Sequence, residues 1–162
     1  MFKKALPVFL AALLIPAALL AEGTIELKNT AEAEVVTTDA KGKKTIAMVP
    51  AADAKVVPGM DVVFTTTYKN TGTKPAEKVV IINPVPEHMV YEAGSAGGEG
   101  TKATFSVDGG KTFSAPEKLR IKEKDGKERL AKTSDYTHIR WEALKPVAVK
   151  EGGAVRFRAK LE

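Results

Sequence analysis

The residues that close the chain, AVRFRAKLE, alternate strictly between apolar and polar side chains. One face would carry Val155, Phe157, Ala159 and Leu161, and the other Arg156, Arg158 and Lys160. A repeat of two residues fits a half-buried β-strand, because successive side chains of a strand point to opposite faces. No segment beyond the N-terminal apolar run shows a sustained 3.6-residue apolar repeat. The chain is therefore expected to fold from strands.

Other segments of the same kind are separated by clusters of glycine, proline, asparagine and aspartate. They read TIELKN with AEAEVVTT, TIAMV, DVVFTTTY, KVVIIN, MVYEAGS, TKATFSV, EKLRIKEKDGKERL and THIRWEAL. KVVIIN (residues 78–83) is apolar on both faces, so we expect it in the centre of a sheet. Short strands at regular spacing predict an all-β sandwich or barrel.

Residues 1–21 have the features of an export signal. Two lysines precede a 17-residue uncharged apolar run that ends in small residues. This pattern predicts a signal peptide cleaved between Ala21 and Glu22. A retained membrane anchor is the alternative, but a run of this length containing two prolines is short for crossing roughly 30 Å of hydrocarbon. We expect a periplasmic, extracellular or cell-surface protein that meets a membrane only through the signal peptide before cleavage.

The remaining residues, 22–162, are enough for one domain with a sizeable core. They hold no cysteine, so stability has to come from core packing without disulfides. Removal of Lys3 and Lys4 leaves 23 basic and 20 acidic residues, a net charge of +3. The lysines are interspersed with acids and form no basic stripe with aromatic residues, which argues against nucleic-acid binding.

Four turn motifs occur in order within residues 57–95. They are Pro58–Gly59, Asn70–Thr71–Gly72, Pro75–Ala76 and Asn83–Pro84–Val85–Pro86. With these motifs the block resembles the repeat called domain of unknown function eleven (DUF-eleven), which is common in bacterial exported and surface proteins. The family usually has aspartate where this chain has Asn83.

The resemblance implies an immunoglobulin-like antiparallel β-sandwich over residues 57–162, preceded by N-terminal strands and a connection over 22–56. Residues 22–162 are expected to form a single domain. The family pattern carries no catalytic residues. Its matching residues are expected to serve turns: Pro58 and Gly59 lead into a strand, Asn70 bonds its own backbone, Gly72 tolerates positive φ, Asn83 favours a turn, and Pro84 and Pro86 end strand pairing.

The stretch FSVDGGKTFS contains S-x-D-x-G-x-T-F from Ser106 to Phe113, the spacing of an Asp-box known from sialidases and other β-proteins. Asp108, Gly109 and Gly110 suit a tight hairpin turn. A sialidase also needs an arginine cluster and a propeller of several sheets, for which this chain is too short. The motif therefore predicts a structural turn, without a sugar-cleaving site.

Side chains able to do chemistry are few and scattered. His88 and His138 lie 50 residues apart without a metal-ligand pattern, and no G-x-S-x-G motif occurs. We predict no catalytic residues, no metal and no cofactor. Trp141, the single tryptophan, is expected in the core. The alternative is a sugar-stacking platform formed by Tyr136, Arg140 and Trp141.

These features favour an exported, non-enzymatic structural or adhesive protein of the bacterial envelope or extracellular space. The N-terminal strand either belongs to its own sandwich or completes the sheet of a neighbour by strand addition, with this protein itself or another envelope protein as partner. The alternative function is a carbohydrate- or protein-binding module.

Overall fold

The computed structural model describes residues 24–162. The predicted signal peptide and its Ala21–Glu22 junction lie outside the described residues. Strands and two short 3₁₀-helices make up the described part, and no α-helix occurs in it. The elements are β1 (Ile25–Thr38), β2 (Lys44–Pro50), β3 (Asp61–Asn70), β4 (Val80–Pro84), β5 (Met89–Tyr91), β6 (Gly97–Gly98), β7 (Thr101–Ser106), η1 (Pro116–Lys118), β8 (Arg120–Lys122), β9 (Glu128–Leu130), η2 (Thr133–Asp135), β10 (His138–Ala143) and β11 (Gly152–Leu161). In the described part no helix is long and apolar enough to cross a membrane.

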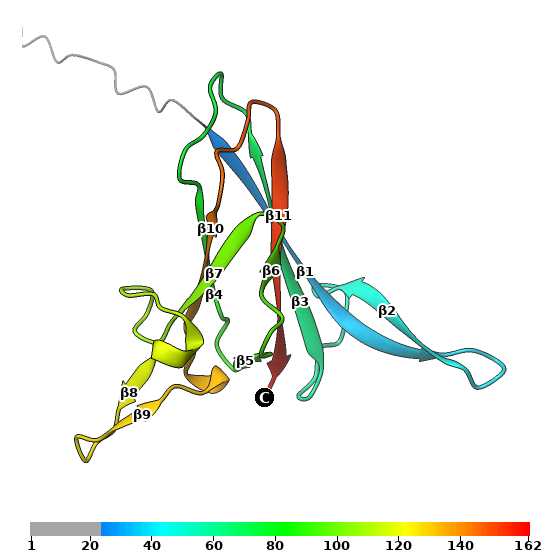
Figure 1. Cartoon of the computed structure of the whole chain (residues 1–162). Coiled ribbons are helices and arrows are strands. Elements are labelled where there is room, and N and C mark those ends of the chain that lie inside the picture. The colour runs from blue at the N-terminus through cyan, green and yellow to red at the C-terminus, as the bar shows by residue number, and fades with distance from the viewer. Residues whose placement is uncertain (1–23) are drawn as a thin grey trace, which may run out of the picture.

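Two antiparallel sheets face each other, which confirms the predicted all-β, sandwich-like fold (Figure 1). The larger sheet has the order β2-β1-β3-β11-β5, with β6 also paired to β11. The smaller sheet has the order β4-β10-β7, and β8 and β9 form a separate hairpin. Figure 1 shows that this hairpin and the β1–β2 ribbon project from the body in different directions.

The N-terminal strand is part of the larger sheet of its own chain. The first two thirds of β1 pair with β3, from Ile25 opposite Asn70 to Ala33 opposite Val62. Its end pairs with β2, from Glu32 opposite Pro50 to Thr38 opposite Lys44. β1 is long enough to connect the body of the sandwich to the ribbon.

The strand formed by KVVIIN does not lie centrally, so that expectation is wrong. β4 pairs only with β10 and forms an edge of the smaller sheet. Ile81 points into the sandwich, whereas Val80 and Ile82 are exposed on its outer side. In this strand, apolar residues on both faces therefore do not mean that both faces are buried.

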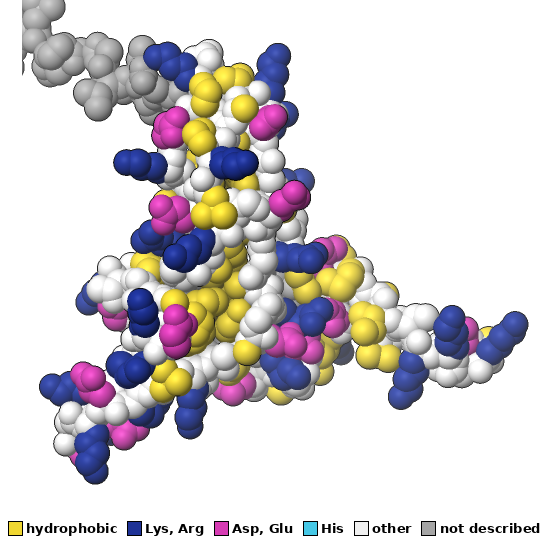
Figure 2. All heavy atoms as spheres, in the orientation of Figure 1, with side chains coloured by type: hydrophobic (Ala, Val, Ile, Leu, Met, Phe, Trp, Pro, Cys, Tyr) yellow, Lys and Arg dark blue, Asp and Glu magenta, His cyan; other side chains and the backbone are white. Residues whose placement is uncertain are grey.

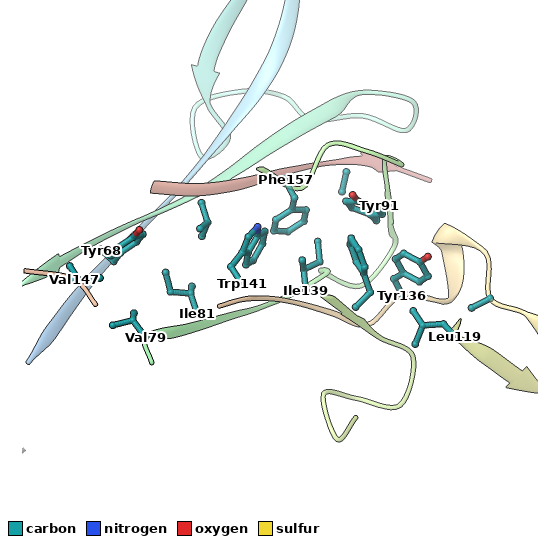
Figure 3. Close-up of a cluster of buried hydrophobic side chains, with 14 of the residues drawn as sticks. Tyr68, Val79, Ile81, Tyr91, Leu119, Tyr136, Ile139, Trp141, Val147 and Phe157 are labelled. Atoms are coloured by element: carbon teal, nitrogen blue, oxygen red, sulfur yellow. The ribbon is translucent and has the colours of Figure 1, made fainter. Parts of the chain in front are cut away.

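The core between the sheets is built from aromatic and branched side chains. Trp141 and Ile139 extend from β10 toward Phe157 on β11, as Figure 3 shows. The Trp141 and Phe157 ring centroids lie 6.2 Å apart, and Phe64 stacks on the other side of Phe157 at 4.9 Å. Trp141 is only 1% exposed, which confirms it as a core residue.

A second aromatic group extends the core toward the β8–β9 hairpin. Phe105 lies between Tyr91 and Tyr136, with ring centroids 5.2 Å and 4.9 Å away. All three rings are buried, and Leu119 and Ala131 from either end of the hairpin join the same cluster. The hairpin is thus anchored to the core although its tip projects into solvent.

Asn70 connects three parts of the chain through its buried amide. Its Nδ2 donates to the carbonyl oxygens of Lys74, at 2.8 Å, and Val147, at 2.9 Å, and its Oδ1 accepts from the Gly72 N–H at 2.9 Å. The predicted Asn70 turn is confirmed. The expected positive φ of Gly72 is wrong, because Gly72 is not among the glycines with positive φ. Gly72 contributes its N–H to the Asn70 carboxamide instead.

The remaining turn residues divide between turns and strands. Gly59 adopts φ +91° in the turn after Pro58, and its N–H donates to the Leu161 carbonyl at 2.7 Å. Pro84 ends β4, and Pro86 accepts a hydrogen bond from the Met89 N–H in the turn that follows.

Asn83 lies within β4, so its expected turn role is wrong. Its Nδ2 donates to the hydroxyl of buried Thr66 on β3 at 2.7 Å, and that hydroxyl donates to Asn29 Oδ1 at 2.7 Å. Asn83 therefore joins the two sheets by a polar contact.

Trp141→Ala should lower the free energy of unfolding by about 3–5 kcal/mol, because it removes the largest fully buried side chain and leaves a cavity between the sheets. Urea unfolding followed by far-UV circular dichroism measures the change. Leu144→Ala, at an exposed position next to the same strand, should stay within about 0.5 kcal/mol of the native protein. A similar loss for both variants would contradict this assignment of the core.

Asn70→Ala should cost about 2–3 kcal/mol, because the fully buried Asn70 amide makes three hydrogen bonds, to the Lys74 and Val147 carbonyls and from the Gly72 N–H, and all three are lost. The same unfolding measurement tests this. Thr73→Ala changes an exposed side chain in the same turn and serves as the matched control. If the two variants are equally stable, the Asn70 amide does not hold the loops together.

Candidate interaction surface

The Asp-box residues form a compact loop in which polar groups of the loop are hydrogen-bonded to one another. Phe105 and Ser114 exchange two backbone hydrogen bonds of 2.9 Å that close the loop. Inside it, Asp108 Oδ1 accepts from the backbone N–H groups of Lys111 and Thr112 at 3.0 Å, and Oδ2 accepts from the Thr112 hydroxyl at 2.6 Å. Gly109 and Gly110 adopt φ +76° and +83°, which favours glycine. The predicted turn is confirmed.

The bonds to Asp108 also set its titration. The Thr112 hydroxyl and backbone N–H, with the Ser106 hydroxyl, hold the pKa of the Asp108 carboxyl well below its ordinary value. The carboxylate is therefore ionised at neutral pH and occupied by its own loop.

The proposed stacking platform of Tyr136, Arg140 and Trp141 does not form, and this expectation is wrong. Trp141 and Tyr136 are 1% and 8% exposed, because both rings fill the core. Only Arg140 reaches the surface, where it forms an ion pair with Glu142 at 2.7 Å and its guanidinium lies 5.6 Å from the centre of the Phe113 ring. Neither the Trp141 ring nor the Tyr136 ring offers a sugar a face to stack on.

The two histidines lie on different segments of the chain. His88 has φ +63° in the turn before β5, and His138 begins β10 next to Gly110 of the Asp-box loop. Among residues 24–162 no group of three or more histidine, cysteine, aspartate or glutamate side chains is placed to hold a metal ion.

A shallow groove of about 630 Å³ lies where the edges of the two sheets meet. One side is the beginning of β1, with Ile25 and Leu27, and the other is the segment before and at the start of β4, with Val79 and Val80. No further strand pairs with either side of the groove, because this part of β1 pairs only with β3 and β4 pairs only with β10. The groove combines two open strand edges with a lining of apolar side chains and the charged residues Lys74 and Glu77.

The β1–β2 ribbon ends in a well-ordered turn. The Asp39 N–H donates to the Lys43 carbonyl at 3.0 Å, and Asp39 Oδ1 accepts from the Lys41 and Lys43 N–H groups at 2.9 Å. Gly42 supplies the positive φ, +80°, that the turn needs. This turn joins AEAEVVTT and TIAMV, two of the segments that the sequence predicts to be strands.

The side chains of the ribbon are unusually exposed for their type. Val36 and Ile46 lie directly opposite each other and are 62% and 65% exposed, and Met48 is 44% exposed. Figure 2 shows hydrophobic side chains on the ribbon between the body of the sandwich and the lysine-bearing tip. We call Val36, Ile46 and Met48 the ribbon patch. It contributes nothing to the buried core cluster.

Sequence reasoning found these strands but missed their exposure. An apolar strand such as TIAMV reads as buried unless the number of its neighbours is known. The available signal was the connection that follows TIAMV and ends at residue 56, which separates the first two strands from residues 57–95.

Comparisons of this chain with protein-family models, with curated proteins and with solved structures found no match. The function is therefore argued from the residues of the chain itself.

Asp108→Asn should destabilise the protein in a pH-dependent way. The Asp108 pKa is depressed in the folded state, so its stabilisation is complete above the unfolded value of about 3.9 and is lost as the pH falls below it. Urea unfolding of the native protein and the variant at a series of pH values measures the difference. The advantage of the native protein should shrink below about pH 4; a difference that is equal at neutral and acidic pH would count against this role of the carboxylate.

Proposed function

We propose that the protein is an exported, non-enzymatic β-sandwich of the immunoglobulin-like kind, with a structural or adhesive role in the bacterial envelope or outside the cell. It acts by binding another protein through the β1–β2 ribbon. The observation that carries the proposal is the ribbon patch, three large apolar side chains on a projecting element that the core does not use. Exposed apolar groups of this kind mark protein interaction sites.

Export is supported by the lysine-led apolar run of residues 1–21. The immunoglobulin-like assignment is supported by two facing antiparallel sheets and by the DUF-eleven-like turns around β3 and β4. A non-enzymatic role is supported by the use of polar side chains within the fold, as with Asp108 in its loop and Asn70 in its turn.

A protein-binding module that takes an extended peptide is the second candidate. It is favoured by the groove between the start of β1 and β4, where two unpaired edges flank apolar side chains. An added strand would gain backbone hydrogen bonds at such an edge. Carbohydrate binding is not favoured, because the tryptophan and tyrosine expected to stack on a sugar are buried.

Site-specific photocrosslinking in living cells tests the proposal. A benzophenone side chain placed at position 46 should give protein adducts, because this position lies in the ribbon patch. Position 124, at the tip of the equally projecting β8–β9 hairpin, is the matched control and should give few adducts. The mass of the labelled protein is read in the same samples and should correspond to a chain beginning at Glu22.

The outcomes separate the two candidates. Adducts at position 46 well above those at position 124 support binding through the ribbon. Adducts at position 82 on the β4 edge without any at position 46 favour the groove. Equal yields at positions 46 and 124 would overturn the ribbon as a binding element.

A further inference from the structure

We propose that the partner of the ribbon is a second copy of this chain, paired β2 to β2 in antiparallel orientation about a two-fold axis at Ala47. The inference rests on the proposed function, since it names the protein that the ribbon binds. It follows from the direction of the free backbone groups of β2, from the chemistry of this edge, and from the match of β2 to itself.

The backbone groups at the free edge belong to alternate residues of β2. Hydrogen bonds from the Asp39 N–H to the Lys43 carbonyl, 3.0 Å, and from the Ala51 N–H to the Ala31 carbonyl, 2.8 Å, flank the β1–β2 pairing. In an antiparallel pair, the residues that bond to the partner strand alternate with those that do not. Odd-numbered residues of β2 therefore bond to β1, and Lys44, Ile46 and Met48 direct their N–H and C=O groups to the open edge.

Between its first residue, Lys44, and its last, Pro50, this edge lacks the features that keep strands from pairing with another chain. Proteins block exposed edges with charged side chains, prolines, bulges or very short strands. Residues 45–49 of β2, TIAMV, contain no charge and no proline, and their register with β1 has no bulge.

Other open edges in the described part are better protected. The unpaired beginning of β1 carries Glu26 and Lys28, and β5 has only three residues. β4 ends at Pro84, which has no N–H, so only Val80 and Ile82 remain as donors at its outer edge.

Two β2 strands fit each other when Ala47 lies opposite Ala47 of the second copy. All seven residues of β2 are then paired, with Ile46 opposite Met48 of the second copy and Lys44 opposite its Pro50. Ile46 and Met48 face each other in hydrogen-bonded pairs, as their free N–H and C=O groups require. In the Lys44–Pro50 pairs only the Lys44 N–H can donate, because Pro50 has no N–H. A two-fold axis repeats each contact, which is the usual symmetry of a homodimer.

The side chains are complementary in the same register. Val36, Ile46 and Met48 share one face of the ribbon, so the two copies bring six exposed apolar side chains into one continuous patch. At each end, Lys44 of one copy comes within two strand spacings, about 10 Å, of Glu32 of the other, across Pro50. The apolar side chains of the two copies thus become neighbours on one face of the extended sheet, and opposite charges flank them.

Cysteine pairing tests the register directly, because the chain contains no other cysteine. In Ala47→Cys, the two residues at the axis form a non-hydrogen-bonded pair with Cα atoms about 4.5 Å apart, a separation that a disulfide bridges. Dilute protein under mild oxidation should therefore form a covalent dimer. In Thr45→Cys, the two cysteines lie four residues apart along the strands, about 14 Å, and should not be bridged.

The outcomes are decisive for the register. Rapid dimer formation by Ala47→Cys with little by Thr45→Cys supports it, and reduction should return both to the starting mass. Faster bridging of Thr45→Cys, or no bridging of either variant, overturns the proposed pairing. Far-UV circular dichroism and the fluorescence of buried Trp141 confirm that each variant is folded.

Sedimentation of the natural sequence, from micromolar to near-millimolar protein, provides the second measurement. It should show a reversible dimer whose dissociation constant rises more than about tenfold in Ile46→Lys, because two lysines enter each interface. Ile82→Lys replaces an exposed apolar side chain on β4 and should leave the dimer unchanged. A dimer weakened by Ile82→Lys and not by Ile46→Lys would place the contact elsewhere.

Rejection of the β2-to-β2 dimer would not by itself reject the proposed function. Protein that stays monomeric throughout the series, while position 46 crosslinks to a different protein in cells, rejects the second copy and keeps the ribbon as a binding element. Absence of adducts at position 46 rejects both.

Discussion

The contact between Trp141 on β10 and Phe157 on β11 is the interaction on which the rest of the fold depends. It lies between the two sheets, with Ile139 beside it and Phe64 stacked behind Phe157. Without cysteines, no covalent bond joins the sheets, so burial of these apolar groups has to supply the stability. The aromatic group around Phe105 extends the same core toward the β8–β9 hairpin and keeps it attached.

A sandwich of two open sheets has unpaired strand edges, and in this chain the edges differ in how well they are protected against pairing with another strand. β4 ends at Pro84, and the start of β1 carries charged residues; both features disfavour pairing with a strand of another chain. The ribbon instead carries its apolar side chains away from the core, on an edge without charge between residues 45 and 49. This contrast explains why the ribbon is the surface through which the protein is proposed to associate, and why the partner is expected to add a strand.

Polar residues that resemble functional markers in the sequence serve the fold. Asp108 stabilises its own loop, Asn70 holds two connections together, and Asn83 links the sheets through Thr66. The Asp108 loop and the turn at Asn70 were predictable, because Asx turns involve only neighbouring residues. The bond from Asn70 to Val147, 77 residues away, was not predictable from the sequence. The role of Asn83 was not, since its partner lies 17 residues away on the facing sheet.

The sequence by itself determined the elements that depend on local chemistry. Alternation in residues 154–161 identified a half-buried strand, and the Asp-Gly-Gly turn and the strand pair around Gly42 were likewise evident. Only the tertiary structure decided which strands have two neighbours. An apolar pattern shows which side chains of a strand could be buried. Whether they are buried depends on the neighbouring strands, which come from distant parts of the sequence. For this reason KVVIIN became an edge strand, TIAMV became an exposed ribbon, and Tyr136 entered the core.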